Sequence, residues 1–140
     1  MSIPKHLRLE FVTPERAIVH LDVDEVEIPG EDGYFGVLPG HAPLLAALKV
    51  GELWYRTGAE TRYTFVAGGF AEVVGDRVSI LAQVAEHAED IDAERADAAK
   101  RRAEEQLARP AADADFERAR IALLRAISRQ QIARHARRRS

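Results

Sequence analysis

Histidine and serine are the residue types of this chain that could bind a metal or act as a nucleophile, and its glycines could form a phosphate-binding loop. The chain has five histidines and no cysteine. The histidines lack the spacing of zinc ligands, and no pattern of His, Asp and Glu completes a site. None of the serines lies in a nucleophile motif, and the three glycines of residues 30–36 lack the Gly-Lys-Ser/Thr ending of a phosphate loop. The sequence therefore predicts a protein with no catalytic, metal or cofactor site of its own.

Anion binding is the chemistry that the second half of the chain does indicate. Residues 91–96 read IDAERA, which places Asp92 and Arg95 three residues apart near the start of a predicted helix. On a second predicted helix, Arg125 and Arg129 are four residues apart, so their planar guanidinium groups project together and suit a polyphosphate or a carboxylate. The alternative that the local pattern leaves open is a helix cap at Asp92 and solvated arginine faces.

Residues 33–45, GYFGVLPGHAPLL, form the most irregular part of the sequence. Three glycines open backbone angles that other residues avoid, and Pro39 and Pro43 each remove a backbone donor. The segment predicts a shaped surface loop rather than a strand, with His41 pointing outward and with apolar side chains that cover a core edge or meet a partner. The alternative is a well-packed connection whose histidine is hydrogen-bonded.

Strands are predicted over most of the chain up to residue 85. Leu7, Leu9 and Phe11 alternate with Arg8 and Glu10, as in a strand with one buried face. Similar short strands are predicted at residues 17–21, 24–28, 44–48, 53–56, 63–67, 71–74 and 77–81, separated by turns that include residues 57–59, 68–69 and 75–76. Short strands at this spacing are typical of an antiparallel β-sandwich. The predicted fold class is α+β, with the sandwich at residues 1–85.

Alanine and charged residues dominate from residue 86 onward, and the apolar period becomes helical. Helices are predicted at residues 93–109 and 116–137, with Asp92 and either Asp113 or Asp115 as N-caps and with Pro110 ending the first. The short connection predicts a C-terminal antiparallel two-helix hairpin at residues 86–140. Stripes of alanine would join these helices and bury little area, while other apolar residues stay uncovered. The hairpin is therefore predicted to be a movable element.

The net charge of −3 hides an asymmetry along the 140 residues. From Phe116 onward there are eight arginines and a single acid, Glu117, so the C-terminal quarter is suited to a negatively charged partner. Nucleic acid is disfavoured because no aromatic residues or binding motif accompany these arginines. The chain shows no apolar run that predicts a signal peptide or a membrane span. A free-standing adaptor and a nucleic-acid-binding protein with a basic helical tail remain the alternatives from the residues alone.

The loop of residues 33–45 and its neighbours closely resemble the epsilon subunit of the bacterial rotary proton-translocating ATP synthase. The likeness includes EVEIPGEDG before the loop, AALKVGEL after it, Phe70 and Ala71, and the IDAERA segment. This resemblance implies a non-catalytic central-stalk subunit that binds the gamma subunit and the ring of c subunits. It implies a peripheral position at the cytoplasmic face of the bacterial inner membrane, and a rotor contact formed by Glu31, Tyr34 and His41.

The same resemblance implies regulation. Some epsilon subunits bind ATP through an I/L-D-x-x-R-A motif, and the matching positions here are Ile91, Asp92, Arg95 and Ala96, with Glu86, Arg102, Arg125 and Arg129 at the other positions of that site. ATP is thus implied as a regulatory ligand. When ATP is scarce, the second helix would extend toward the alpha and beta subunits and offer Arg118, Arg120 and Arg125 to acidic beta-subunit segments, which would restrain ATP hydrolysis.

Overall fold

The computed structural model describes residues 5–139, and the chain divides into two compact units, Met1–His87 and Ala88–Ser140. The predicted boundary lay two residues earlier, after residue 85. The last strand of the first unit, β8 (Arg77–His87), continues through Glu86 and His87 because both residues still pair with the neighbouring strand. Each unit is described separately below.

Eight strands build the first unit, and most follow the predicted alternation of buried and exposed residues. They are β1 (Leu7–Val12), β2 (Ala17–Val23), β3 (Glu25–Gly30), β4 (Gly33–Val37), β5 (Leu44–Ala47), β6 (Gly51–Thr57), β7 (Glu60–Val74) and β8. Strand β1, for example, buries Leu7, Leu9 and Phe11 completely and exposes Arg8. Alternation arises because successive side chains of a strand point to opposite faces.

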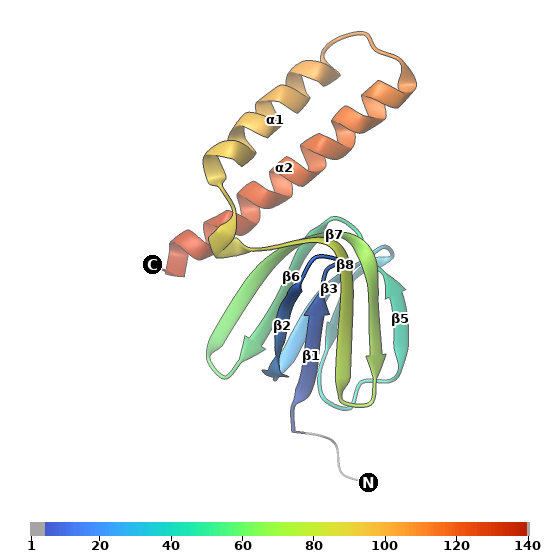
Figure 1. Ribbon diagram of the computed structural model, residues 1–140, viewed down its shortest axis with the longest axis vertical. Helices are drawn as coiled ribbons and strands as arrows, with labels where there is room; N and C mark the ends of the chain where they lie inside the picture. Colours follow the sequence, from blue (N-terminus) through green and yellow to red (C-terminus); the bar gives the residue numbers. More distant parts are fainter. Residues whose placement is uncertain (1–4, 140) are drawn as a thin grey trace. The chain divides into compact units, whose positions relative to one another are not determined.

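The strands pair in the order β2-β1-β8-β7-β6-β3-β4, and β5 pairs with β7 beyond the end of β6. This path folds over on itself into the two layers of a sandwich, as Figure 1 shows. The predicted β-sandwich is therefore confirmed, and all but one of the pairings between strands within residues 5–139 are antiparallel. The exception is the pair β1–β8, which is parallel and joins the first and last strands of the unit.

Residues 68–69 do not separate two strands as predicted, since β7 runs unbroken from Glu60 to Val74. Both glycines have positive φ, 76° at Gly68 and 117° at Gly69, yet the pairing with β8 keeps its register on either side of them. A Cβ on Gly69 would collide with the carbonyl oxygen of Leu81. The two glycines thus let the long strand bend while β8 stays closely paired with it.

The prediction of a loop over residues 33–45 was wrong for its first part. Strand β4 pairs with β3 from Gly30–Gly33 to Val26–Val37, so Glu31 and Asp32 form the connecting turn. The glycines do not prevent pairing, because each still has the backbone N–H and C=O groups of a paired strand. The remaining residues, 38–43, form the predicted irregular connection to β5.

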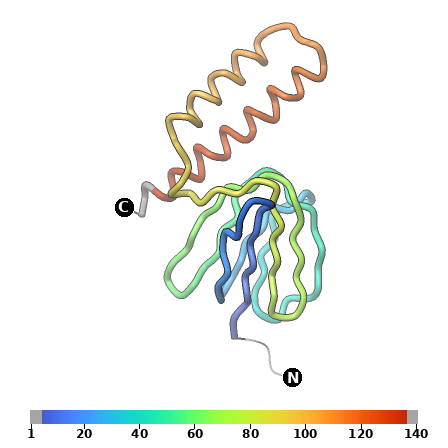
Figure 2. Tube along the Cα trace, in the orientation of Figure 1, coloured from blue at the N-terminus to red at the C-terminus, as the bar shows by residue number. Residues whose placement is uncertain are grey.

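The second unit contains a short 3₁₀ turn, η1 (Ala88–Asp90), and two helices, α1 (Ala93–Leu107) and α2 (Asp113–Arg139). The chain passes along α1 and returns along α2, as the trace in Figure 2 shows, so the predicted hairpin is confirmed. Asp92 caps α1 as predicted, because its side chain accepts a hydrogen bond of 3.1 Å from the backbone N–H of Arg95.

The second helix begins earlier than predicted. The carbonyl oxygen of Ala112 accepts hydrogen bonds from the backbone N–H groups of Asp115 and Phe116. Asp113 and Asp115 consequently lie inside the first turn and do not cap it. Their carboxylates still favour this helix end, because the amino terminus of a helix carries partial positive charge.

Alanine methyl groups line the contact between the helices, as the sequence predicted. Ala96 and Ala103 of α1 are buried, and so are Ala119 and Ala126 of α2. Large apolar side chains on α2 remain exposed, with 45% of the surface of Phe116 and 41% of that of Ile121 accessible to solvent. Among the described residues, no helix is long and apolar enough to cross a membrane.

Candidate functional site

The residues predicted to bind a nucleotide lie mainly on the helical hairpin. Asp92 and Arg95 stand at the start of α1, exposed to solvent, whereas Ile91 and Ala96 beside them are buried. These two apolar members therefore support the local fold. Glu86 belongs to β8 in the other unit.

The arginines of the predicted nucleotide site lie along both helices. The hydrogen bond between Asp97 and Gln130 fixes the register of the hairpin, and in this register Arg102 of α1 lies level with Arg125 of α2. Arg129 lies about one turn nearer the start of α1. The register thus places the backbone positions of these three arginines within a short stretch of the hairpin, and their combined positive charge would suit a polyphosphate.

Arg125 has an unusual environment for a charged side chain. Its Nε atom is buried and has no hydrogen-bond partner among the residues that the structure describes, and the residue as a whole is half-buried. A buried donor without an acceptor is unfavourable by about 1–3 kcal/mol. An anionic ligand that reached this guanidinium would remove part of that cost.

The predicted rotor-contact residues are not gathered at one point. Glu31 is in the exposed turn between β3 and β4, and Tyr34 follows near the start of β4. His41 lies beyond the other end of that strand, whose five residues span about 16 Å. His41 Nδ1 lies 2.6 Å from the carbonyl oxygen of Ala42, so the predicted hydrogen-bonded histidine is present. The side chain is half-buried rather than fully outward.

Tyr34 is half exposed and has two neighbours. The Nζ atom of Lys49 lies 4.6 Å from the centre of its ring, and its hydroxyl oxygen accepts a hydrogen bond of 3.3 Å from the backbone N–H of Glu52. Gly51 permits this contact, since a Cβ there would collide with the tyrosine hydroxyl. The ring is therefore held in place with one face toward solvent.

An apolar row on the outer face of the sandwich was missed by the sequence reasoning. Ala47 of β5 pairs with Phe70 of β7, Phe70 with Leu81 of β8, and Leu81 with Val12 of β1. Phe70 and Leu81 expose 55% and 56% of their surface. We call these four residues the outer apolar row. The sequence did contain a signal for this row. Phe70 and Leu81 are bulky and apolar, although strand alternation places their neighbours Ala71 and Ile80, and not them, on the core face.

A hollow of about 320 Å³ lies along this row. Its walls come from the β1–β2 connection and from the bend of β7, and its lining residues are Val12, Thr13, Pro14, Gly69, Phe70, Leu81, Ala82 and Gln83. Exposed apolar surface combined with concavity is typical of a protein–protein contact. The first unit therefore offers a docking surface on its outer face.

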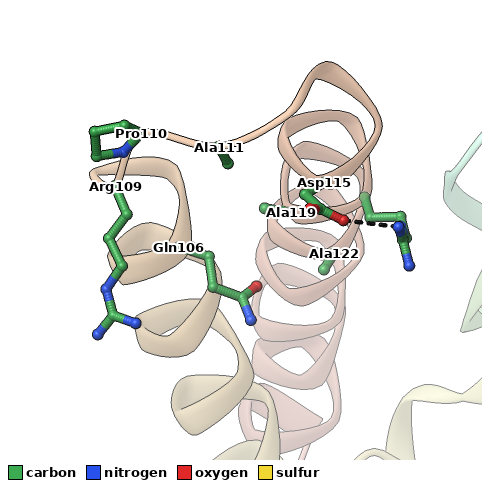
Figure 3. A pocket seen from close by; sticks show the side chains of 8 residues that line it. Gln106, Arg109, Pro110, Ala111, Asp115, Ala119 and Ala122 are labelled. Atoms are coloured by element: carbon green, nitrogen blue, oxygen red, sulfur yellow. Dashed lines mark hydrogen bonds and ion pairs between the residues drawn. The ribbon is translucent and has the colours of Figure 1, made fainter.

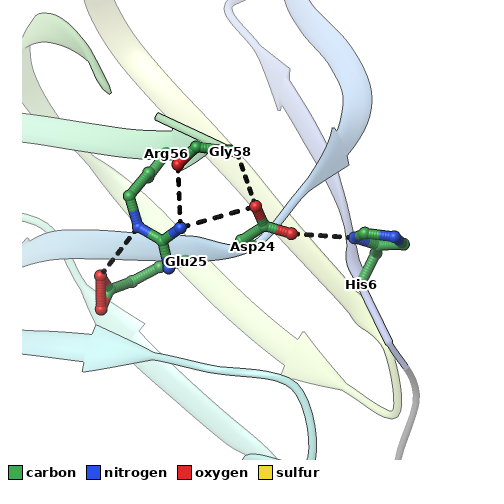
Figure 4. A network of polar contacts seen from close by, with 5 residues as sticks. All are labelled: His6, Asp24, Glu25, Arg56 and Gly58. Carbon is green, nitrogen blue, oxygen red and sulfur yellow. Dashed lines mark hydrogen bonds and ion pairs between the residues drawn. The ribbon is translucent and has the colours of Figure 1, made fainter. Parts of the chain in front are cut away.

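A polar network at one end of the sandwich was also not predicted (Figure 4). Asp24 accepts a hydrogen bond of 2.7 Å from the backbone N–H of Gly58, and its other oxygen lies 2.9 Å from His6 Nδ1. Arg56 lies 3.5 Å from Asp24 and 3.7 Å from Glu25. No sequence signal joins residues so far apart. The network connects the residue before β1 to the β6–β7 turn, so it is a structural tie rather than a ligand site.

We expect Asp24→Asn to lower the stability of the sandwich at neutral pH. The Gly58 N–H, followed by His6 and Arg56, holds the pKa of the Asp24 carboxyl below its ordinary range. Because the folded value lies below the unfolded one, the stabilisation is complete above about pH 4 and is lost as the pH falls through the lowered value. Urea unfolding should therefore separate the variant from the wild type at pH 7, with the gap closing at low pH. Asp22→Asn, an exposed neighbour, is the control, and a gap that persists unchanged into acid would contradict this account.

The three arginines predicted to contact the beta subunits are not equivalent. Arg118 Nη2 lies 2.7 Å from Asp115 Oδ1, and Arg120 Nη2 lies 3.0 Å from Glu117 Oε2, each acid three residues earlier on α2. Arg120 holds the pKa of Glu117 below its ordinary range. Both arginines are highly exposed, so these intrahelical pairs contribute little stability and leave the guanidinium groups accessible. Arg125 is more enclosed, as described above.

No group of three or more His, Cys, Asp and Glu side chains capable of holding a metal ion occurs among residues 5–139. The features that remain are a docking surface on a β-sandwich and an arginine-rich helical hairpin. Together they describe a chain of two units, in which the first exposes an apolar surface and the second carries exposed arginines.

Comparison with known proteins identifies the family. Residues 6–88 match the family described as ATP synthase, Delta/Epsilon chain, beta-sandwich domain, and residues 89–134 match ATP synthase, Delta/Epsilon chain, long alpha-helix domain. The chain belongs to the ATP synthase delta/epsilon chain family. The predicted fold class and the resemblance to epsilon subunits are both confirmed.

Bacterial relatives are similar over nearly their whole length. The chain is 48% identical over 132 residues to an ATP synthase epsilon chain of Nitratidesulfovibrio vulgaris, covering 94% of this chain and 98% of that protein. It is 50% identical over 127 residues to that of Syntrophobacter fumaroxidans, covering 91% and 95% of the two chains.

Chains of solved ATP synthase complexes are similar in structure. A chain of the Euglena gracilis mitochondrial ATP synthase, OSCP/F1/c-ring in rotational state 1, is 27% identical with a TM-score of 0.84, covering 91% of this chain and 81% of that one. A chain of the Tetrahymena thermophila mitochondrial ATP synthase central stalk/c-ring has a TM-score of 0.56 at 15% identity and covers 68% and 75%, which shows a shared fold only.

Proposed function

We propose that this chain is the non-catalytic epsilon subunit of the central stalk in a bacterial proton-translocating ATP synthase. In this role it couples rotation driven by protons to ATP synthesis in the catalytic head, and it restrains ATP hydrolysis through its movable helical hairpin. It works as a peripheral protein at the cytoplasmic face of the bacterial cell membrane. Support comes from the family membership and from the similarity to a chain of a solved complex that contains F1 and the c-ring.

The outer apolar row is the observation that carries the docking part of this proposal. Phe70 and Leu81 are each more than half exposed beside a concave hollow, and exposed apolar side chains gathered in this way are typical of an interaction surface. In the stalk, this face binds the gamma subunit. The turn at Glu31, the ring of Tyr34 and the loop at His41 belong to a separate edge of the sandwich and form the contacts with the rotor that includes the c-ring.

The regulatory part of the proposal rests on the hairpin. ATP binds to the closed hairpin through Asp92 and Arg95 at the start of α1 and through Arg125 and Arg129 on α2, with Arg102 alongside. The buried, unpaired Nε of Arg125 supports this assignment, since it is a donor that lacks an acceptor in the described residues. A ligand that binds only the closed state stabilises it by an amount that grows with its concentration.

We expect calorimetric titration of the purified chain to show saturable ATP binding that is lost in Arg125→Ala. Asp92 needs a more careful variant, because Asp92→Ala also removes the helix cap, at about 1 kcal/mol. Asp92→Ser keeps a capping oxygen and removes the carboxylate, so it separates the two roles. Arg101→Ala changes an exposed neighbouring arginine and is expected to bind normally.

The absence of binding up to millimolar ATP would contradict the nucleotide-sensing part alone. Asp92 would then be a helix cap, and regulation would depend on the arginines of α2. The docking part would stand, because it depends on a different unit of the chain.

A further inference from the structure

A hydrogen bond between side chains joins the two helices at the end of the hairpin away from the connecting loop. Gln130 Nε2 of α2 donates to Asp97 Oδ1 of α1 over 2.5 Å. The acceptor is a carboxylate, and hydrogen bonds to charged groups are stronger than those between neutral groups. We call this contact the interhelix clasp.

The apolar contact between the two helices is weak. Along much of its length it consists of alanine methyl groups, such as those of Ala103 and Ala126, which bury a small fraction of the area of a leucine, and Ile132 of α2, 2% exposed, is a large side chain buried near the clasp. Several larger side chains of α2, including Phe116 and Leu124, remain in solvent. The polar contact between Asp97 and Gln130 acts in addition to this modest apolar packing.

The loop end of the hairpin is underfilled. A pocket of about 460 Å³ lies between the end of α1 and the start of α2, lined by Gln106, Arg109, Pro110, Ala111, Asp115, Arg118, Ala119 and Ala122. In Figure 3, Gln106 reaches toward α2, whereas Arg109 points away from it. The ion pair at this end, Asp115–Arg118, lies within α2 and does not join the helices. The loop end thus has the loose packing expected of a pivot.

The clasp acts far from that pivot. Gln130 is 17 residues beyond the first residue of α2, which corresponds to about 25 Å along the helix axis. A small rotation about the loop would therefore move Gln130 well beyond hydrogen-bonding distance of Asp97. Closing the clasp, in turn, fixes the relative position of Arg102 and Arg125.

We infer that the clasp between Asp97 and Gln130 is the lock of the helical hairpin, and that its loss populates a state in which α2 has swung away from α1. Both residues are positioning residues for the proposed regulation, and neither is among the residues assigned to nucleotide or to beta-subunit contacts. The effect of the lock on ATP hydrolysis rests on the proposed function. The lock itself does not, because it can be measured in the isolated chain.

Distance measurement between spin labels tests the lock directly. The chain has no cysteine, so Glu105→Cys and Arg134→Cys place two labels at exposed sites without background. The closed register puts them about 20 Å apart, from 12 residues of helix rise plus the separation of the axes. Swinging α2 about the loop lengthens this distance.

We expect Gln130→Ala and Asp97→Ala each to lower the ratio of closed to open hairpin by about tenfold. Gln130→Glu opposes two carboxylates and should open the hairpin further. The double variant D97N/Q130E exchanges donor and acceptor and should restore closure. Gln131→Glu makes the same chemical change at an exposed neighbour and should leave the distance distribution unchanged.

Identical distance distributions in Gln130→Ala, Asp97→Ala and the wild type would overturn the inference, and so would a double variant that stays as open as Gln130→Glu. A second assay separates this result from failure of the proposed function. If the clasp variants open the hairpin but do not change inhibition of ATP hydrolysis in the assembled complex, the lock stands and the proposed inhibitory role fails.

Discussion

Replacing Phe70 and Leu81 by aspartate is expected to weaken binding of this chain to the gamma subunit by at least about a hundredfold. Burying a side chain of this size contributes roughly 1.5–3 kcal/mol, and an unpaired carboxylate in the same contact adds a further penalty. A hundredfold loss corresponds to about 2.7 kcal/mol. Both side chains are more than half exposed in the isolated chain, so the substitutions should leave the fold intact.

Surface plasmon resonance with an immobilised gamma subunit measures this effect. Val74→Asp is the matched control, because Val74 lies on the same strand as Phe70, is 55% exposed like it, and stands outside the outer apolar row. Normal affinity of the F70D/L81D variant would contradict the docking surface. Equal losses in the variant and in the control would show that the effect does not depend on the row.

Replacing Arg118, Arg120 and Arg125 by alanine is expected to raise ATP hydrolysis by the assembled complex several-fold. The extended α2 presents these side chains to acidic segments of the beta subunits in the proposed mechanism. Each exposed ion pair contributes up to about 1 kcal/mol, so loss of three amounts to a tenfold to hundredfold weaker inhibitory contact. Salt should relieve inhibition in the same way, because it screens exposed charges.

The ion pairs within α2 suggest control variants that should not weaken inhibition. Arg118 and Arg120 are paired with Asp115 and Glu117 on their own helix. Asp115→Asn and Glu117→Gln release the two guanidinium groups without removing them, and should leave inhibition equal or stronger. Unchanged inhibition in the triple arginine variant would contradict the proposed contact, while inhibition lost in both sets of variants would point to helix stability instead.

Local patterns in the sequence predicted the elements of this fold well where one residue type decides the conformation. Alternation of apolar and polar residues located β1, and the Gly75–Asp76 turn joins β7 to β8 as expected. Asp92 caps α1 because a short acidic side chain satisfies the free N–H of Arg95. These features depend on neighbours within a few residues.

Features that depend on distant partners could not be predicted. The parallel pairing of β1 with β8 joins residues about 70 positions apart, and no local pattern specifies it. Glycine content suggested a loop at residues 33–37, but pairing with β3 makes this segment a strand. At Gly68 and Gly69 the glycines mark a bend within a paired strand rather than its end.

The candidate sites show the same limit. Spacing on one helix could place Arg125 and Arg129 on a common face, but only the hairpin register brings Arg102 level with Arg125. The outer apolar row crosses four strands, so it emerges only when their pairing is known. The clasp between Asp97 and Gln130 also requires the hairpin register.

The central claim is that the sandwich docks while the hairpin regulates, and one measurement tests both parts together. ATP hydrolysis by a catalytic head that contains gamma is measured after addition of the full chain or of residues 1–87, which form the first compact unit. The account predicts that both bind with similar affinity and that only the full chain inhibits hydrolysis. Equal inhibition by the two, or failure of residues 1–87 to bind while remaining folded, would contradict it.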